Sequence, residues 1–62
     1  MFIQIEDKEG KKHYVNINQI EYVKECDDGT AEIDFADGFL YTMDRYKMVI
    51  ADIFRAQKEG NK

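Results

Sequence analysis

Residues 30–43 read TAEIDFADGFLYTM, and this stretch decides the fold because it is the clearest β-hairpin in the chain. On either side of its central Ala-Asp-Gly segment, apolar and polar residues alternate with the period of two that a half-buried strand requires. A two-residue Asp-Gly turn would place Phe35 opposite Leu40. A three-residue loop with Gly38 in the left-handed region would place Phe35 opposite Phe39 and gather the apolar residues on one face. We therefore predict the three-residue loop.

The rest of the chain supplies three further short strands. Residues 2–6 and 13–17 alternate in the same way and predict a second hairpin, closed by a polar turn in which Gly10 supplies the positive φ. Residues 16–19 predict a tight bend or a single helical turn, because Asn and Gln side chains can bond to the local backbone. A strand at residues 20–24 follows, which brings the expected number of strands to about five.

The last third of the chain has the periodicity of an amphipathic helix. Asp44 is well placed as its N-cap, and Gly60 as the terminator after a last turn near Lys58. The expected buried face consists of Tyr46, Val49, Ile50, Ile53, Phe54 and Gln57. A small antiparallel sheet with one C-terminal helix packed on one face makes an α+β fold, which we expect to form a single domain over residues 1–62.

The length of 62 residues indicates a thin core. A domain of this size buries only about 60 % of the surface that its unfolded chain exposes, so small scaffolds usually rely on a disulfide, a metal or a partner chain. Cys26 is the single cysteine and His13 the single histidine, which excludes an internal disulfide and gives no zinc site. Self-association is the remaining route, and we expect a homodimer.

The sequence also favours one cellular compartment. No apolar run approaches the roughly 20 residues that a membrane span needs, so no membrane contact is expected. The N-terminus lacks the basic and apolar regions of a signal peptide. Together with the one unpaired cysteine, these features predict a reduced, cytoplasmic protein.

The net charge of −4 is concentrated in one stretch. Between residues 21 and 37 a single base, Lys24, stands against seven carboxylates, which are Glu21, Glu25, Asp27, Asp28, Glu32, Asp34 and Asp37. Such a field repels phosphate backbones and argues against nucleic-acid binding. The simplest interpretation is a solvated surface. An alternative is an acidic inhibitor that mimics nucleic acid and blocks a nucleic-acid-binding protein.

No residues form a recognisable catalytic, cofactor or metal site. Residues 27–34 resemble an acidic metal loop, but they lack the ligand spacing and the flanking helices of an EF-hand. His13 could act as an acid or base oriented by Glu6 or Glu9, yet there is no serine or second histidine to complete a hydrolase site. We therefore expect a protein that is not an enzyme and binds no cofactor or metal.

Surplus aromatic residues indicate the contact surface, because aromatic side chains are over-represented at interface hot spots. The expected covered face consists of Ile3, Ile5, Val15, Ile33, Phe35, Phe39 and Tyr41. Phe2, Tyr14 and Leu40 then lie on the opposite face. We predict that Phe2, Tyr14, Tyr22 and Leu40 bind a protein partner.

Several short motifs follow one another along nearly the whole chain: FIQI at 2–5, Gly10, YVNIN at 14–18, IEYV at 20–23, and Asp37-Gly38 before a closing helix. This pattern resembles the FlbD-like family of small proteins of flagellar operons. The resemblance implies a small cytoplasmic regulator or adaptor without catalytic residues.

Residues 20–23, with DGFLY at 37–41 and the closing helix, also resemble the first two thirds of a LytTR DNA-binding domain. This second resemblance implies a truncated DNA-binding regulator as an alternative. The leading hypothesis remains a cytoplasmic interaction module, homodimeric, that regulates or adapts a protein partner.

Overall fold

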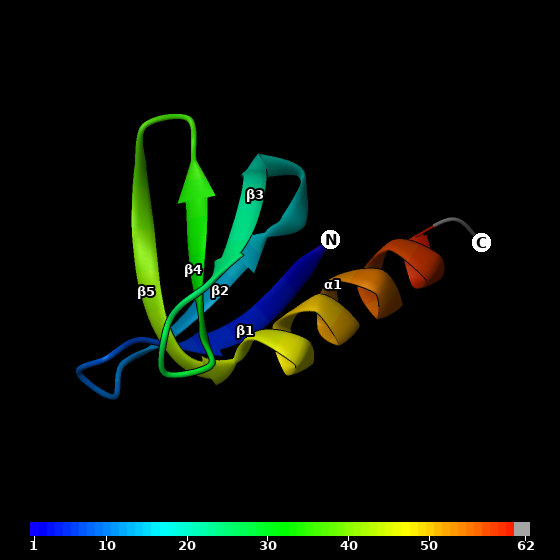
Figure 1. Ribbon diagram of the computed structural model, residues 1–62. Helices are drawn as coiled ribbons and strands as arrows, with labels where there is room; N and C mark the ends of the chain where they lie inside the picture. The colour runs from blue at the N-terminus through cyan, green and yellow to red at the C-terminus, as the bar shows by residue number, and fades with distance from the viewer. Residues whose placement is uncertain (61–62) are drawn as a thin grey trace.

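The computed structural model describes residues 1–60, in which five antiparallel strands precede one helix (Figure 1). The α+β fold expected from the sequence is confirmed. The elements are β1 (Phe2–Glu6), β2 (Lys12–Asn16), a 3₁₀ turn (Ile17–Gln19), β3 (Ile20–Glu25), β4 (Thr30–Phe35), β5 (Gly38–Arg45) and α1 (Tyr46–Gly60).

The strands form two small sheets that β5 connects. Strands β1 and β2 pair as a hairpin, and β3, β4 and β5 form a three-stranded meander with β4 in the centre. An isolated antiparallel bridge between Asp7 and Thr42 joins the end of β1 to β5. Helix α1 contacts β1, β3, β4 and β5, so it closes the inner side of both sheets. Within residues 1–60 no helix is long and apolar enough to span a membrane.

The core lies between the inner faces of the two sheets and α1. Its buried apolar side chains are Ile3, Ile5, Val15, Ile17, Ala31, Ile33, Val49 and Ala56. The alternation seen in the sequence explains the strand residues in this set, because every second residue of a strand faces the same side. Ile33 and Val49, at 0 % and 1 % exposure, form its centre.

The predicted register of the β4–β5 hairpin is wrong. Phe35 pairs with Gly38 and Ile33 with Leu40, around a two-residue turn. Gly38 does not adopt a positive φ, whereas Gly10 does, as expected, and so does Gly29. A register shift of one residue moves every side chain of a strand to its other face. Leu40 therefore packs against the core.

The same shift changes the expected covered face. Phe39 and Tyr41, predicted to be covered, are exposed on the outer side of the sheet. Contacts with distant residues favour this register. Thr42 is fully buried and bonds to the backbone of Ala31, and Asp44 bonds to the backbone of Glu6.

Three expectations for the helix also need correction. Asp44 is not its N-cap, since Asp44 Oδ2 accepts a hydrogen bond from the Glu6 N–H at 3.0 Å, and the N–H of Tyr46 donates to the carbonyl oxygen of Gly29 at 2.9 Å. Phe54 is 66 % exposed and Gln57 is exposed too, although both were expected on the buried face, which includes Ala56 instead. The helix extends to Gly60, two residues past the predicted last turn.

Candidate functional site

The structure separates the four residues predicted to bind a partner. Phe2 and Tyr14 lie on the outer face of the β1–β2 hairpin, where the register makes them diagonal neighbours. Tyr22 is exposed on β3, in the other sheet. Leu40 is partly buried against the core, so its predicted place on the exposed face with Phe2 and Tyr14 is wrong.

The outer side of the three-stranded sheet gathers a different set of side chains. One row across the sheet consists of Tyr22, Asp34 and Phe39, and the neighbouring row consists of Lys24, Glu32 and Tyr41. We call these six residues the outer sheet face. In both rows the carboxylate stands on the central strand β4, and an aromatic ring stands on at least one flanking strand.

The aromatic side chains of the outer sheet face are ordered by contacts with their neighbours. The rings of Phe39 and Tyr41 meet edge to face, with centroids 5.1 Å apart and an interplanar angle of 74°. This arrangement suits the ring quadrupoles. The ammonium nitrogen of Lys24 lies 5.2 Å from the centroid of the Tyr22 ring, within the range of a cation–π interaction. Tyr22, Phe39 and Tyr41 are nevertheless 49 %, 60 % and 47 % exposed.

The two carboxylates at the centre of the outer sheet face lack ion-pair partners. The ion pairs among residues 1–58 are Lys8–Asp28, His13–Asp7 and Arg55–Asp52. Asp34 Oδ1 is buried and accepts no hydrogen bond from the described residues. The pKa of Glu32 is raised, mainly because hydrogen bonding with the Asp34 side chain favours its protonated form, and further because of desolvation and the Asp34 charge. Two carboxylates thus lie in an aromatic surround with one cationic neighbour, Lys24, which forms no ion pair with either of them.

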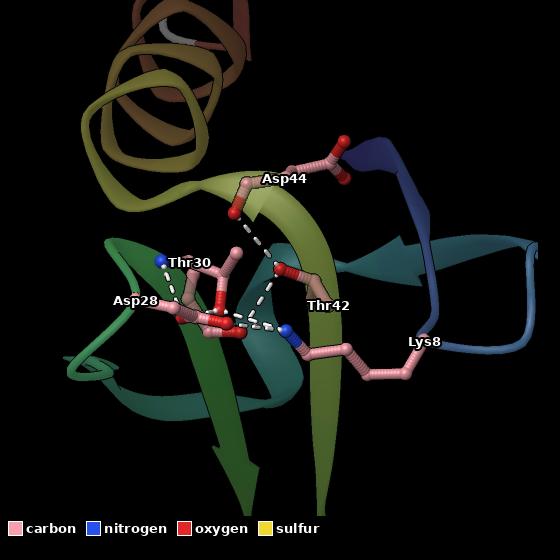
Figure 2. Close-up of polar contacts among 6 residues, drawn as sticks. Lys8, Asp28, Thr30, Thr42 and Asp44 are labelled. Atoms are coloured by element: carbon pink, nitrogen blue, oxygen red, sulfur yellow. Dashed lines mark hydrogen bonds and ion pairs between the residues drawn. The ribbon is translucent and has the colours of Figure 1, made fainter.

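A polar cluster joins the β1–β2 turn to the β3–β4 turn (Figure 2). Lys8 Nζ, from the β1–β2 turn, donates to Asp28 Oδ2 at 3.0 Å and to Thr30 Oγ1 at 3.1 Å. Asp28 Oδ1 also accepts from the Thr30 N–H at 3.0 Å. Hydrogen bonds from Thr30, followed by Lys8, hold the pKa of Asp28 well below its usual range. The Asp28 oxygens are therefore engaged in fixing the β3–β4 turn.

His13 is held by a residue that the sequence did not indicate. Its Nε2 lies 2.7 Å from Asp7 Oδ2, whereas Glu6 and Glu9 were the predicted partners, so that prediction is wrong. Asp7 Oδ1 accepts the N–H groups of Glu9 and Lys11, both at 2.9 Å. The bond to His13 is the largest cause of the lowered pKa of Asp7. The Asp7–His13 pair thus links the two ends of the β1–β2 turn.

No cluster of three metal-ligating side chains lies within the described residues. The chain matches no protein-family model, no curated protein and no solved structure. Any function must therefore be argued from the arrangement of the side chains, and the outer sheet face is the strongest candidate. Sequence reasoning included Tyr22 among the partner-binding residues, but it placed Phe39 and Tyr41 on the covered face. The signal that could have found them is the alternation of residues 39–43, once the length of the turn before it is known.

Proposed function

We propose that the protein is a non-enzymatic interaction module that binds a protein partner through its outer sheet face, as a regulator or adaptor. The observation that carries the proposal is the exposure of Tyr22, Phe39 and Tyr41 on one side of a sheet whose other side is covered by the core. Grouped exposed apolar side chains are typical of interaction sites, and tyrosine is enriched at binding hot spots.

The remaining polar groups favour binding over catalysis. The Asp7–His13 pair and the Lys8–Asp28–Thr30 cluster both hold turns, and each uses its carboxylate oxygens for backbone N–H groups of that turn. Their chemistry is accounted for by the fold. The regulatory or adaptor role that the FlbD-like resemblance implies is of the same kind as the proposed role.

We further propose that the protein is a cytoplasmic homodimer. The single unpaired Cys26 supports a reducing compartment. Phe2 and Tyr14 support self-association, because they are 62 % and 73 % exposed on the β1–β2 hairpin, away from the outer sheet face. Sedimentation equilibrium is expected to give a dimer, and Phe2→Ser/Tyr14→Ser is expected to give a monomer. A wild-type monomer at all concentrations up to the millimolar range would rule the dimer out.

The acidic mimic is the second candidate, favoured by the absence of an ion pair at Glu32 and Asp34 among residues 1–58. Asp28 does not support the acidic mimic, because its charge is already paired with Lys8. The two candidates differ in salt dependence, since screened charges would carry the affinity of a mimic and apolar contacts that of an adaptor.

A capture experiment from nuclease-treated lysate, eluted with steps of increasing salt, tests the proposal. We expect a partner that remains bound at high salt, and we expect Tyr22→Ala to weaken its retention without changing the circular dichroism spectrum. Release of a nucleic-acid enzyme at low salt would favour the mimic. Loss of the fold in Tyr22→Ala would mean that Tyr22 serves the core.

A further inference from the structure

We propose that the outer sheet face binds an arginine side chain of the partner protein, presented on an extended segment, above Glu32 and Asp34 and among the flanking aromatic rings. This inference rests on the proposed function and names the chemistry of the partner. It is carried by three features of the face: the carboxylates without ion pairs, the position of the rings, and the place where Lys24 lies.

The carboxylates provide the charge complementarity. Glu32 and Asp34 are two residues apart on β4 and so point to the same side of the sheet. Asp34 Oδ1 is buried without a donor among the described residues. That atom is out of reach of a docking partner, but Glu32 and Asp34 are both partly exposed, so a partner's donor can reach their other carboxylate oxygens. A cationic donor fits best, because two carboxylates face the single ammonium group of Lys24 on this side of the sheet.

The rings select the shape of that cation. Strands β3 and β5 lie on the two sides of β4, so the backbones that carry Tyr22 and Tyr41 are separated by about two strand spacings, or roughly 10 Å. A planar group can enter between side chains at this separation. Guanidinium is planar, stacks on aromatic faces and donates two parallel hydrogen bonds to carboxylates, whereas ammonium offers only a compact charge. The face therefore fits arginine better than lysine.

The chain's own Lys24 shows that a cation is accommodated at this surface. Its ammonium lies over the Tyr22 ring, and its strand position is directly opposite Glu32. It forms no ion pair with Glu32 or Asp34. Lys24 thus marks the edge of the face and leaves the carboxylates available to a second cation.

Fluorescence anisotropy with labelled nonapeptide pools tests the inference. Each pool has random flanking residues and one fixed central residue, which is arginine, lysine, citrulline or leucine. Citrulline keeps the shape of arginine without its charge. We expect the arginine pool to bind wild-type protein most tightly, with a loss of about tenfold or more for citrulline.

Two double variants with the same change in net charge separate specific from general electrostatic attraction. Glu32→Gln/Asp34→Asn is expected to weaken binding of the arginine pool by about tenfold, and Glu21→Gln/Asp27→Asn by less than about twofold. Equal losses in both variants, or equal binding of the arginine and citrulline pools, would overturn the inference.

The outcomes also distinguish this inference from the proposed function. If the leucine pool binds as tightly as the arginine pool and Phe39→Ser/Tyr41→Ser abolishes binding, the face binds protein segments but does not select arginine. If neither the carboxylate variant nor the aromatic variant changes the binding of any pool, both the inference and the proposed function are contradicted.

Discussion

Thr42 Oγ1 donates a hydrogen bond to the backbone carbonyl oxygen of Ala31 across 2.9 Å, at the register shift in the β4–β5 ladder. Both residues are fully buried. Thr42 also forms the backbone bridge to Asp7. Asp44, two residues further along β5, accepts a hydrogen bond from the backbone of Glu6 at the end of β1 (Figure 2). This one side chain therefore stands at the junction of the two sheets and helps to fix the register that exposes the outer sheet face.

Replacing Thr42 with valine is expected to destabilise the protein although the side-chain shape is kept. The carbonyl oxygen of Ala31 loses its side-chain donor in a buried site, which lowers the free energy of unfolding by about 1–3 kcal/mol. Thr42→Ser keeps the hydroxyl and loses one methyl group, or about 0.8 kcal/mol. Urea unfolding measures both variants. A valine variant as stable as the wild type would show that the hydrogen bond does not hold the junction.

The two glycines on either side of β4 are expected to differ in their tolerance of alanine. Gly29 has a φ of +84°, and a Cβ atom there would lie 3.0 Å from Arg45 Nη1, whereas at Gly38 no atom lies within 4 Å of an added Cβ. Gly29→Ala should lower the free energy of unfolding by about 1–2 kcal/mol. Gly38→Ala should change it by less than about 0.5 kcal/mol. A larger loss of stability in Gly38→Ala would indicate that Gly38 adopts the left-handed conformation predicted from the sequence.

The pH dependence of stability should report the crowding of the Glu32 and Asp34 carboxyls. The pKa of Glu32 is raised above its usual 4.5, so the folded state holds its proton to higher pH than the unfolded state. Its charge therefore lowers stability as pH rises through the folded pKa, and this loss is absent below pH 4.5. The groups that face Glu32 are Asp34 on its own strand, Lys24 and Tyr22 on β3, and Tyr41 on β5.

Glu32→Gln is accordingly expected to have a higher Tm than the wild type at pH 7, with the difference vanishing as the pH falls to about 4. Thermal unfolding followed by circular dichroism at a series of pH values measures this. Parallel Tm profiles for the two proteins would mean that the folded state does not favour the protonated form of Glu32.

Asp28 should behave in the opposite sense. Because its folded pKa lies below 3.8, its contribution to stability is present above that value and disappears as pH falls through the folded pKa. Asp28→Asn is expected to lower the Tm at pH 7, and the difference from the wild type should shrink in strong acid. The exposed neighbour provides the control, and Asp27→Asn should leave the Tm unchanged at both pH values. Equal effects of the two substitutions would contradict a specific role for the Lys8–Asp28–Thr30 cluster.

The fold class was predictable because it depends on local patterns. Alternation gave the five strands, the 3.6-residue period gave the helix, and Gly10 marked its turn correctly. The register of the β4–β5 hairpin was not predictable in this way. Its turn contains no left-handed glycine, and the bonds that favour it join residues far apart in the sequence, such as Asp44 and Glu6.

The candidate site was equally hard to predict from the sequence, because the register decides which face each β5 side chain occupies. The acidic stretch and the surplus of aromatic residues were visible in the sequence. That Glu32 and Asp34 lie between aromatic rings on one face became visible only once β4 and β5 were aligned. Tyr22, which the sequence placed in the contact surface, is exposed in the structure.

The central claim is that the outer sheet face binds a protein partner, and capture with matched variants tests it most directly. Immobilised wild type, Phe39→Ser/Tyr41→Ser and Met48→Ser/Phe54→Ser are compared on the same nuclease-treated lysate. The last variant removes two exposed apolar side chains from α1, at 59 % and 66 % exposure, as a control for general stickiness. We predict a protein retained equally by wild type and control and reduced at least about tenfold by the outer-face variant. Retention of the same proteins by all three would contradict the account.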